Sequence, residues 1–155
     1  MNGGKQAVLD LLWNEPYKIG HWVGFKGLTT LHNEWLRSFL YADEDQTLLA
    51  HRGSYKTTDL SLFLAIHTVI APNENVMFFR KTDDDVSEVI TQSQKILQSG
   101  ALQKIVYDLY DTDLQLIKAN NSEIHTNLCT SAKGVSQVVG LGIGTSITGK
   151  HADIV

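Results

Sequence analysis

The sequence has a single cysteine, no excess of positive charge and no long hydrophobic run, and each of these absences excludes a class of protein. With only Cys129 present, an internal disulfide framework is impossible. Because no signal peptide opens the chain, we expect a reducing, cytoplasmic setting. The longest apolar run, residues 60–71, is interrupted by polar side chains and is shorter than the roughly 20 residues that cross a bilayer. We therefore expect no association with a membrane.

The charge balance and the spacing of the histidines limit which kinds of ligand the protein is expected to bind. Thirteen basic residues against seventeen acidic residues give a formal net charge of −4. The chain as a whole has no positive field that attracts nucleic acid, so any contact with DNA must be local. The six histidines never stand three or four residues apart, so the sequence predicts no helical metal-binding pair. We expect no metal site formed by protein side chains alone.

What the sequence does contain is an alternation of helical and strand patterns. At 155 residues and 43% hydrophobic, the chain has enough apolar side chains for one globular domain. Apolar periodicity predicts helices over residues 30–41 (with Thr30 as cap), 57–70, 82–98 and 101–110. It predicts strands over residues 47–50 and 75–79, and a hairpin that turns at Asn120-Asn121.

Two glycine-containing stretches are typical of irregular structure. Residues 1–29 carry a proline and several glycines, so we assign them to an N-terminal arm that precedes a partial domain of residues 30–155. Residues 134–149 have three glycines at alternate positions from Gly140 to Gly144. This spacing lacks the full G-x-G-x-x-G pattern of a dinucleotide site, and we expect a mobile connection there.

Alternating strands and helices imply a largely parallel sheet covered by helices, with ligands at the carboxyl ends of the strands. Residues 51–56 lie at such an end, between a predicted strand and a predicted helix. In a phosphate-binding loop, backbone N–H groups and the next helix N-terminus converge on anionic oxygens, and a lysine reaches the terminal phosphates. Lys56 stands at the lysine position, and Thr57 follows it with a hydroxyl suited to Mg²⁺.

The same stretch departs from the usual G-x-x-x-x-G-K-[ST] pattern, because Ala50 and Tyr55 stand at the two glycine positions. A residue that already enters the helix can have an ordinary φ, so the Tyr55 side chain can point away from the phosphates. The alternative is a loop capped by Ser54 in which Lys56 is merely solvated. The residues of this motif alone do not separate the two interpretations.

Three segments, in this order, resemble the ATPase domain of phage large terminase subunits: VGFKGLTTLHNEW (23–35), LAHRGSYKTT (49–58) and SITGKHADIV (146–155). That family has phosphate loops with an internal arginine and a bulky residue before the lysine, as Arg52 and Tyr55 stand here. The resemblance implies an α/β fold, a P-loop NTPase-like three-layer sandwich with a largely parallel central sheet, cut before its later strands.

The resemblance also implies roles for single residues. Lys56 is expected to be the phosphate lysine, and Arg52 a positive charge near the γ-phosphate, both of them catalytic. Thr57 would bind Mg²⁺ through its hydroxyl, so ATP and Mg²⁺ are the implied cofactors. The competing interpretation of Arg52 is a structural ion pair. The implied nucleotide-binding set is Arg52, Gly53, Ser54, Tyr55, Lys56, Thr57 and Thr58.

The family's proteins are motors that use ATP hydrolysis to drive double-stranded DNA into a procapsid, and a separate nuclease domain, not represented here, cuts the DNA. The implied partners are double-stranded phage DNA, the portal protein, the small terminase subunit and further copies in a ring on the portal. The implied location is the host cytoplasm, at the portal vertex. The alternatives are another P-loop ATPase, such as a helicase-like enzyme, and a non-catalytic phage assembly protein.

The family's next motif, an apolar strand that ends in two acids, is not found within the 155 residues. We interpret Asp153 as a residue that leads into that strand, not as a metal ligand, and expect the fragment to bind nucleotide better than it hydrolyses it. The basic pair Arg80-Lys81 could contact DNA or phosphate, although basic residues at strand ends are commonly just solvated. The acids Asp83–Asp85 are explained by a helix dipole.

Trp22, Phe25 and His32 could border an adenine pocket, because the family binds the base with segments that precede the phosphate loop.

Overall fold

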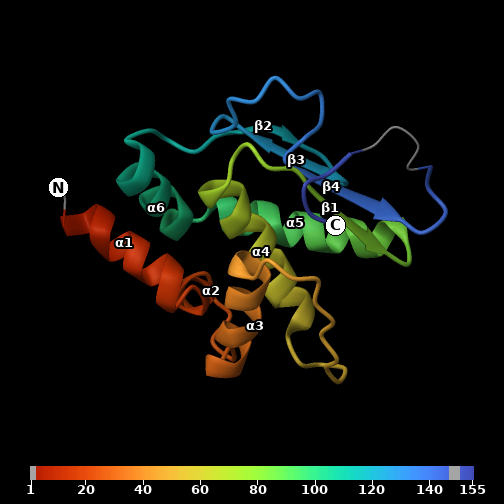
Figure 1. Cartoon of the computed structure of the whole chain (residues 1–155), viewed down its shortest axis with the longest axis horizontal. Coiled ribbons are helices and arrows are strands. Elements are labelled where there is room, and N and C mark those ends of the chain that lie inside the picture. The colour runs from red at the N-terminus through yellow and green to blue at the C-terminus, as the bar shows by residue number, and fades with distance from the viewer. Residues whose placement is uncertain (1–2, 147–150) are drawn as a thin grey trace.

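The structure is a computed structural model that describes residues 3–146 and 151–155. It is a mixed α/β protein, mostly helical, with a small four-stranded sheet (Figure 1). The helices are α1 (Gly3–Asn14), α2 (Tyr17–Trp22), α3 (Thr30–Tyr41), α4 (Lys56–Ile70), α5 (Asp83–Gln98) and α6 (Gly100–Tyr110). The strands are β1 (Val76–Arg80), β2 (Leu116–Ala119), β3 (Glu123–Thr126) and β4 (Val138–Gly142).

The sheet is mixed, and the prediction of a largely parallel sheet is wrong. Its strand order is β1-β4-β3-β2, in which β1 and β4 are parallel and the other two neighbouring pairs are antiparallel. The predicted hairpin is confirmed as β2 and β3. The Oδ1 atom of Asn120 accepts hydrogen bonds from the backbone N–H groups of Ser122 and Glu123, which stabilises the turn. The hairpin supplies the antiparallel half of the sheet.

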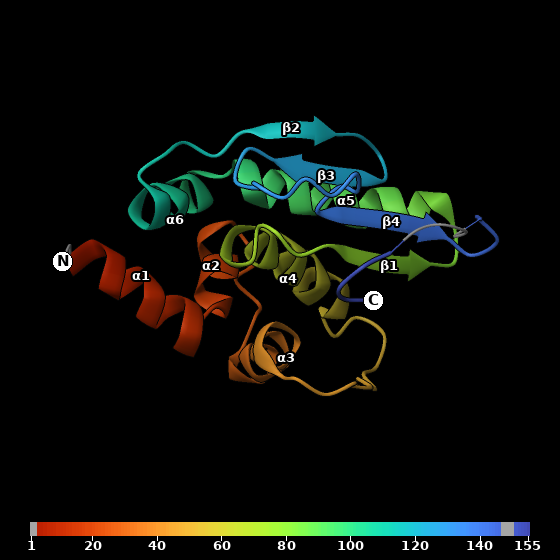
Figure 2. The same ribbon diagram turned by 45° about the horizontal axis from the view of Figure 1, so that its top comes forward.

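Helices α4 and α5 form the centre of the molecule. α5 packs on β1, β3 and β4, and α4 packs between α5 and α3 (Figure 2). On the other face of the sheet, Met77, Val139 and Leu141 are covered by Val135 and Ala152 from connecting segments. The helix that packs on the sheet is α5. The residues that the structure describes therefore do not form the predicted three-layer sandwich.

The predicted helices are confirmed, and their N-termini show why they begin where they do. Thr82 accepts a hydrogen bond from the backbone N–H of Asp85, and Asp83–Asp85 form the acidic first turn of α5. Ser99 caps α6 in the same way. The N-cap of α3 is Thr29 and not Thr30, one residue earlier than predicted.

The prediction of an irregular arm at the N-terminus is wrong for the described part of residues 1–29, because α1 and α2 lie there. The main core includes buried side chains from this region: Val8, Leu12, Ile19 and Leu28. α1 packs against α6, and α2 packs against α3. Glycine lowers helix propensity by about 1 kcal/mol, but burial of an apolar helix face outweighs such local preferences.

Residues 47–50 do not form the predicted strand, and Leu49 is 90% exposed. A strand needs a neighbour for its backbone N–H and C=O groups. One edge of β1 pairs with β4. On the other edge, Val76 pairs in parallel with Ile154, whose carbonyl accepts a 2.9 Å hydrogen bond from the N–H of Met77. Among the described residues no strand pairs with residues 47–50, so the segment reaches α4 as an irregular connection.

The glycine-rich stretch is also corrected, because Gly140 and Gly142 lie in the buried strand β4. A Cβ at Gly140 would lie 2.5 Å from Val86 of α5 and 2.7 Å from the Phe78 ring. The absence of a side chain therefore lets α5 approach the sheet closely, and a mobile connection is wrong for this part. Residues 147–149 of the predicted connection lie outside the described residues.

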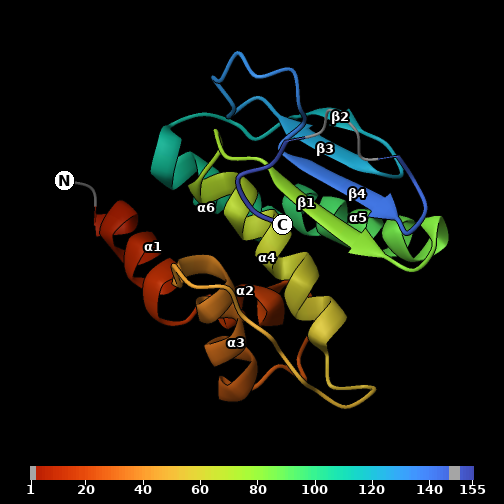
Figure 3. The ribbon, with the colours of Figure 1, turned by 45° about the vertical axis from the view of Figure 1, so that its right-hand side comes forward.

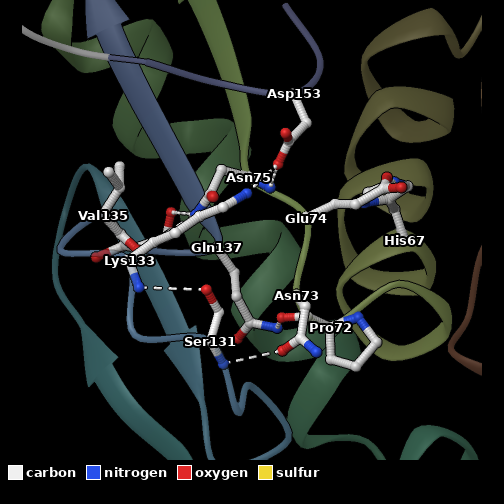
Figure 4. Close-up of polar contacts among 11 residues, drawn as sticks. His67, Pro72, Asn73, Glu74, Asn75, Ser131, Lys133, Val135, Gln137 and Asp153 are labelled. Atoms are coloured by element: carbon white, nitrogen blue, oxygen red, sulfur yellow. Dashed lines mark hydrogen bonds and ion pairs between the residues drawn. The ribbon is translucent and has the colours of Figure 1, made fainter.

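Hydrogen bonds join the segment after β3 and the last residues of the chain to the α4–β1 connection (Figure 4). The Asp153 carboxylate accepts from the backbone N–H of Asn75 at 2.8 Å and from Lys133 Nζ at 3.0 Å. These two bonds hold the pKa of Asp153 below its usual value. The Asn75 side chain donates to the carbonyls of Val135 and Ser136.

Gln137 extends this network into the core, with 1% of its surface exposed. Its Oε1 atom accepts from the backbone N–H of Thr126 at 2.6 Å and from the Thr126 hydroxyl at 2.8 Å. Its Nε2 atom donates to the carbonyls of Pro72 and Thr68 at 2.9 and 3.2 Å. One amide thus joins β3 to the C-terminal end of α4 and the turn that follows.

We expect Gln137→Leu to lower the free energy of unfolding by several kcal/mol, because each buried polar group left without a partner costs about 1–3 kcal/mol. Chemical denaturation measures this difference. Gln98→Leu, at an exposed position at the end of α5, is the matched control and should have little effect. Equal stability of the two variants would contradict the role given to Gln137.

Candidate functional site

The candidate loop, residues 51–55, enters α4 from a connection that runs along the outside of the molecule (Figure 3). Two of its residues have positive φ, Gly53 at 82° and Tyr55 at 60°. The left-handed conformation costs a residue with a side chain about 1–2 kcal/mol. The expectation of an ordinary φ at Tyr55 is therefore wrong, because this tyrosine adopts a conformation that favours glycine.

The Tyr55 side chain points back to the α2–α3 connection. A Cβ placed on Gly27 would lie 2.6 Å from the Tyr55 hydroxyl oxygen, so the ring end lies directly against the Gly27 backbone. The Tyr55 and His32 rings meet edge to face, with centroids 5.7 Å apart and an interplanar angle of 90°. Aromatic pairs of this geometry contribute about 0.5–1.5 kcal/mol, which offsets much of the backbone cost.

His32 links helix α3 to the loop through both ring nitrogens. Its Nδ1 atom accepts from the backbone N–H of Thr29 at 2.9 Å, and its Nε2 atom lies 3.0 Å from the carbonyl oxygen of Ser54. A nitrogen that accepts from a backbone N–H carries no proton, so this network assigns the proton to Nε2, which donates to Ser54. Only 8% of His32 is exposed.

Sequence reasoning considered His32 only as a border of an adenine pocket and missed this contact. The available signal was the spacing Thr29-x-x-His32, which places His32 where the capping box has glutamate or glutamine. The spacing indicates a helix start, but it cannot indicate that the far nitrogen reaches a loop 22 residues later.

The N-terminus of α4 lacks a side-chain cap. Its N-cap is the left-handed Tyr55, whereas Thr82 and Ser99 cap α5 and α6 with their hydroxyls. The first backbone N–H groups of a helix have no intrahelical acceptor and need other partners. Within the described part of the chain, the buried hydroxyl of Ser54 also has no hydrogen-bond partner. The alternative in which Ser54 caps the helix is thus not what the structure contains.

The other predicted site residues lie on or beside this helix end. Lys56 is the first residue of α4, and its Nζ atom donates to the carbonyls of His51 at 2.8 Å and Ala50 at 3.1 Å. Arg52 is exposed and forms no ion pair with any residue in the ranges 3–146 and 151–155. Thr57 and Thr58 are half-buried in the first turn. The structure thus brings all seven residues of the set around one helix terminus.

Asp59 lies beneath this terminus and is fully buried. Neither carboxylate oxygen has a hydrogen-bond partner among the residues that the structure describes. Burial raises the pKa of Asp59 to about 7, because the charged form loses its hydration. Sequence reasoning missed this residue, since a single aspartate in the first turn of a helix is ordinarily explained by the helix dipole.

The remaining candidates do not join the site. Trp22 lines a groove between α1 and α6, whereas Phe25 lines a different groove of about 650 Å³ along α5. Since His32 contacts the loop instead, the three side chains do not border one common pocket. Arg80 ends β1, and Lys81 follows it at the surface.

Comparisons of the chain with protein-family models, with curated proteins and with solved structures found no match. Within the described ranges, no three His, Cys, Asp or Glu side chains are grouped so that they could hold a metal ion. None of the helices described is long and apolar enough to cross a membrane.

The pKa of Asp59 predicts how stability depends on pH in the ligand-free protein. Because this pKa rises from 3.8 to about 7 on folding, the native state binds more protons than the unfolded state between these values. The free energy of unfolding should therefore fall as pH rises from 4 to 8, by up to about 4 kcal/mol. Asp59→Asn should remove most of this fall.

Denaturant titrations of parent and Asp59→Asn at pH 5 and pH 8 measure the difference. Asp45→Asn, at an exposed loop position, is the control and should keep the parental pH dependence. An unchanged pH dependence in Asp59→Asn would contradict the buried, uncharged state of this carboxyl group.

Proposed function

We propose that the loop 51–55 and the N-terminus of α4 bind the phosphates of ATP with Mg²⁺. The observation that carries this proposal is an uncapped helix N-terminus, preceded by left-handed Gly53 and Tyr55 and opened by Lys56. The aligned peptide dipoles of a helix place about half a positive charge at its N-terminus, and its free N–H groups are suited to anionic oxygens. An anion at this position would supply the partners that the helix lacks.

The side chains around the terminus fit the proposed roles. The carbonyls that Lys56 contacts are neutral acceptors, so exchanging them for phosphate oxygens converts two ordinary hydrogen bonds into charge-assisted ones. The Thr57 hydroxyl is a suitable Mg²⁺ ligand, because Mg²⁺ keeps several waters and needs few protein oxygens. The exposed Arg52 guanidinium is free to approach the γ-phosphate, where added positive charge stabilises phosphoryl transfer.

We further propose that the chain is part of a P-loop NTPase and, specifically, of the ATPase domain of a phage large terminase subunit. Support comes from the three segments that resemble that family, because two of them meet in the structure. Residues 23–35 and 49–58 contact each other through Gly27 and Tyr55, and through His32 and Ser54. The third segment pairs with β1 through Ile154.

In this proposal the protein works with double-stranded phage DNA, the portal protein, the small terminase subunit and further copies of itself in a ring. Its place is the host cytoplasm, at the portal vertex of the procapsid. A helicase-like ATPase would use Lys56 in the same way. Binding without hydrolysis, as in a non-catalytic assembly protein, is the second candidate.

We expect Lys56→Ala to abolish detectable Mg·ATP binding, because it removes the positive charge that reaches the terminal phosphates. Isothermal titration calorimetry on the intact protein measures this. Lys5→Ala, which removes an exposed lysine of α1, is the matched control and should bind as the parent does. Equal affinities of Lys56→Ala and the parent would refute the proposed phosphate site.

Arg52 is expected to act in the transition state, where a supplied arginine can be worth about 10³ to 10⁵ in rate. In the full-length enzyme, Arg52→Ala should lower kcat and kcat/KM together by roughly a hundredfold or more, with little change in ATP affinity or melting temperature. Arg52→Lys should recover only part of the rate, since an ammonium cannot donate two parallel hydrogen bonds. Parental rates in both variants, or unfolding of both, would show that Arg52 is not catalytic.

A further inference from the structure

We propose that His32 is a positioning residue for the phosphate loop: its bond to the Ser54 carbonyl orients the peptide between Ser54 and Tyr55, so that the Tyr55 N–H faces the bound phosphate. This inference rests on the proposed nucleotide site and deepens it. It concerns a side chain that touches the loop from the protein side and does not itself contact the ligand.

The peptide unit between Ser54 and Tyr55 has a defined orientation. A trans peptide is planar, and its C=O and N–H groups point in opposite directions. The Ser54 carbonyl points to the Nε2 atom of His32, a side chain that is 92% buried within the protein. The N–H of the same peptide unit belongs to Tyr55, so it must point away from this interior. That direction makes it available to an anion in front of the uncapped helix terminus.

The His32 ring cannot turn independently of its neighbours. Its Nδ1 atom accepts from Thr29 and its Nε2 atom donates to Ser54, so a ring rotation would break both bonds. Its faces and edges are also in contact with aromatic neighbours, Tyr55 at 5.7 Å and Trp35 at 5.2 Å between centroids. The imidazole is therefore a rigid link from α3 to the loop.

Two substitutions can separate the positioning of the loop from the capping of α3, because the two ring nitrogens of His32 have different partners. In His32→Asn the amide oxygen can still accept from Thr29, but the shorter side chain does not reach Ser54. In His32→Gln the amide extends to about the position of Nε2 and can donate to the Ser54 carbonyl, and glutamine is also a standard capping-box residue. The two variants thus keep the cap and differ in the link to the loop.

The experiment compares parent, His32→Asn, His32→Gln and Lys56→Ala by Mg·ATP calorimetry and by thermal melting. Both variants lose the ring contacts of His32, so both should melt below the parent. Only His32→Asn should also bind Mg·ATP about tenfold more weakly, the equivalent of one hydrogen bond to a charged group. His32→Gln should bind nearly as the parent does. A parental Kd in His32→Asn, or a lower melting temperature in both variants with no change in Kd, would overturn the proposal.

Amide hydrogen exchange of the ligand-free protein provides the second readout, which does not depend on nucleotide. His32→Asn should increase exchange over residues 51–56, and His32→Gln should restore it. Unchanged exchange in His32→Asn overturns the positioning role even where ATP binds. Altered exchange together with equal ATP binding by parent and Lys56→Ala would refute the nucleotide site alone, so the two failures are distinguishable.

Discussion

The enclosure of helix α4 between α3 and α5 is the constraint on which the rest of the structure depends. Ten of its fifteen residues are buried, including Leu62, Leu64 and Ile66 with no exposed surface. Buried polar side chains generally need hydrogen-bond partners within the protein, and among the described residues the Asp59 carboxylate is the exception on this helix. The hydroxyls of Ser61 and Thr68 donate to carbonyls one turn earlier. Those bonds lie within the helix, so its position depends on packing: α4 cannot rotate or shift without losing its contacts with α3 and α5.

Each end of α4 is joined to a different part of the molecule. At the C-terminal end, buried His67 bonds to Glu74, and the Thr68 carbonyl accepts from Gln137 of the sheet region. Burial lowers the pKa of His67, which favours the neutral ring at this end. At the N-terminal end, contacts from the α2–α3 connection and α3 hold the loop. Helix α4 therefore runs from the candidate site to the network around Gln137.

The sequence was informative where the signal was local. Apolar periodicity located α4 and α5, and the Asn120-Asn121 turn located the hairpin, because propensity and burial agree there. Prediction from the sequence failed where tertiary contacts determine the local structure. The segment 47–50 has strand-like residues but no strand partner. Position 140 lies in a strand and is nevertheless glycine, because Val86 of α5 and the Phe78 ring leave no room for a side chain. α1 was missed because its glycines outweighed its buried face in a local interpretation.

The candidate site, too, was predictable from the sequence only in part. The set of loop residues followed from residue types and from the family resemblance, whereas the contacts that shape the loop join residues more than twenty positions apart. The fully buried Asp59 could not be recognised either, because burial of a charged residue depends on how α3 and α5 enclose the helix. Periodicity cannot report a contact made by one particular atom.

The tyrosine at a glycine position finds its physical explanation in these contacts. Glycine at position 55 would adopt the left-handed conformation without strain, but it would also leave the loop free to adopt other conformations. Tyr55 costs about 1–2 kcal/mol in the backbone, and its ring then packs on Gly27 and His32. A bulky residue here thus requires a residue without a side chain at position 27, and the edge-to-face contact with His32 adds to its stability. The three positions depend on one another: the strain at Tyr55 is stable only because the α2–α3 connection leaves space for its ring.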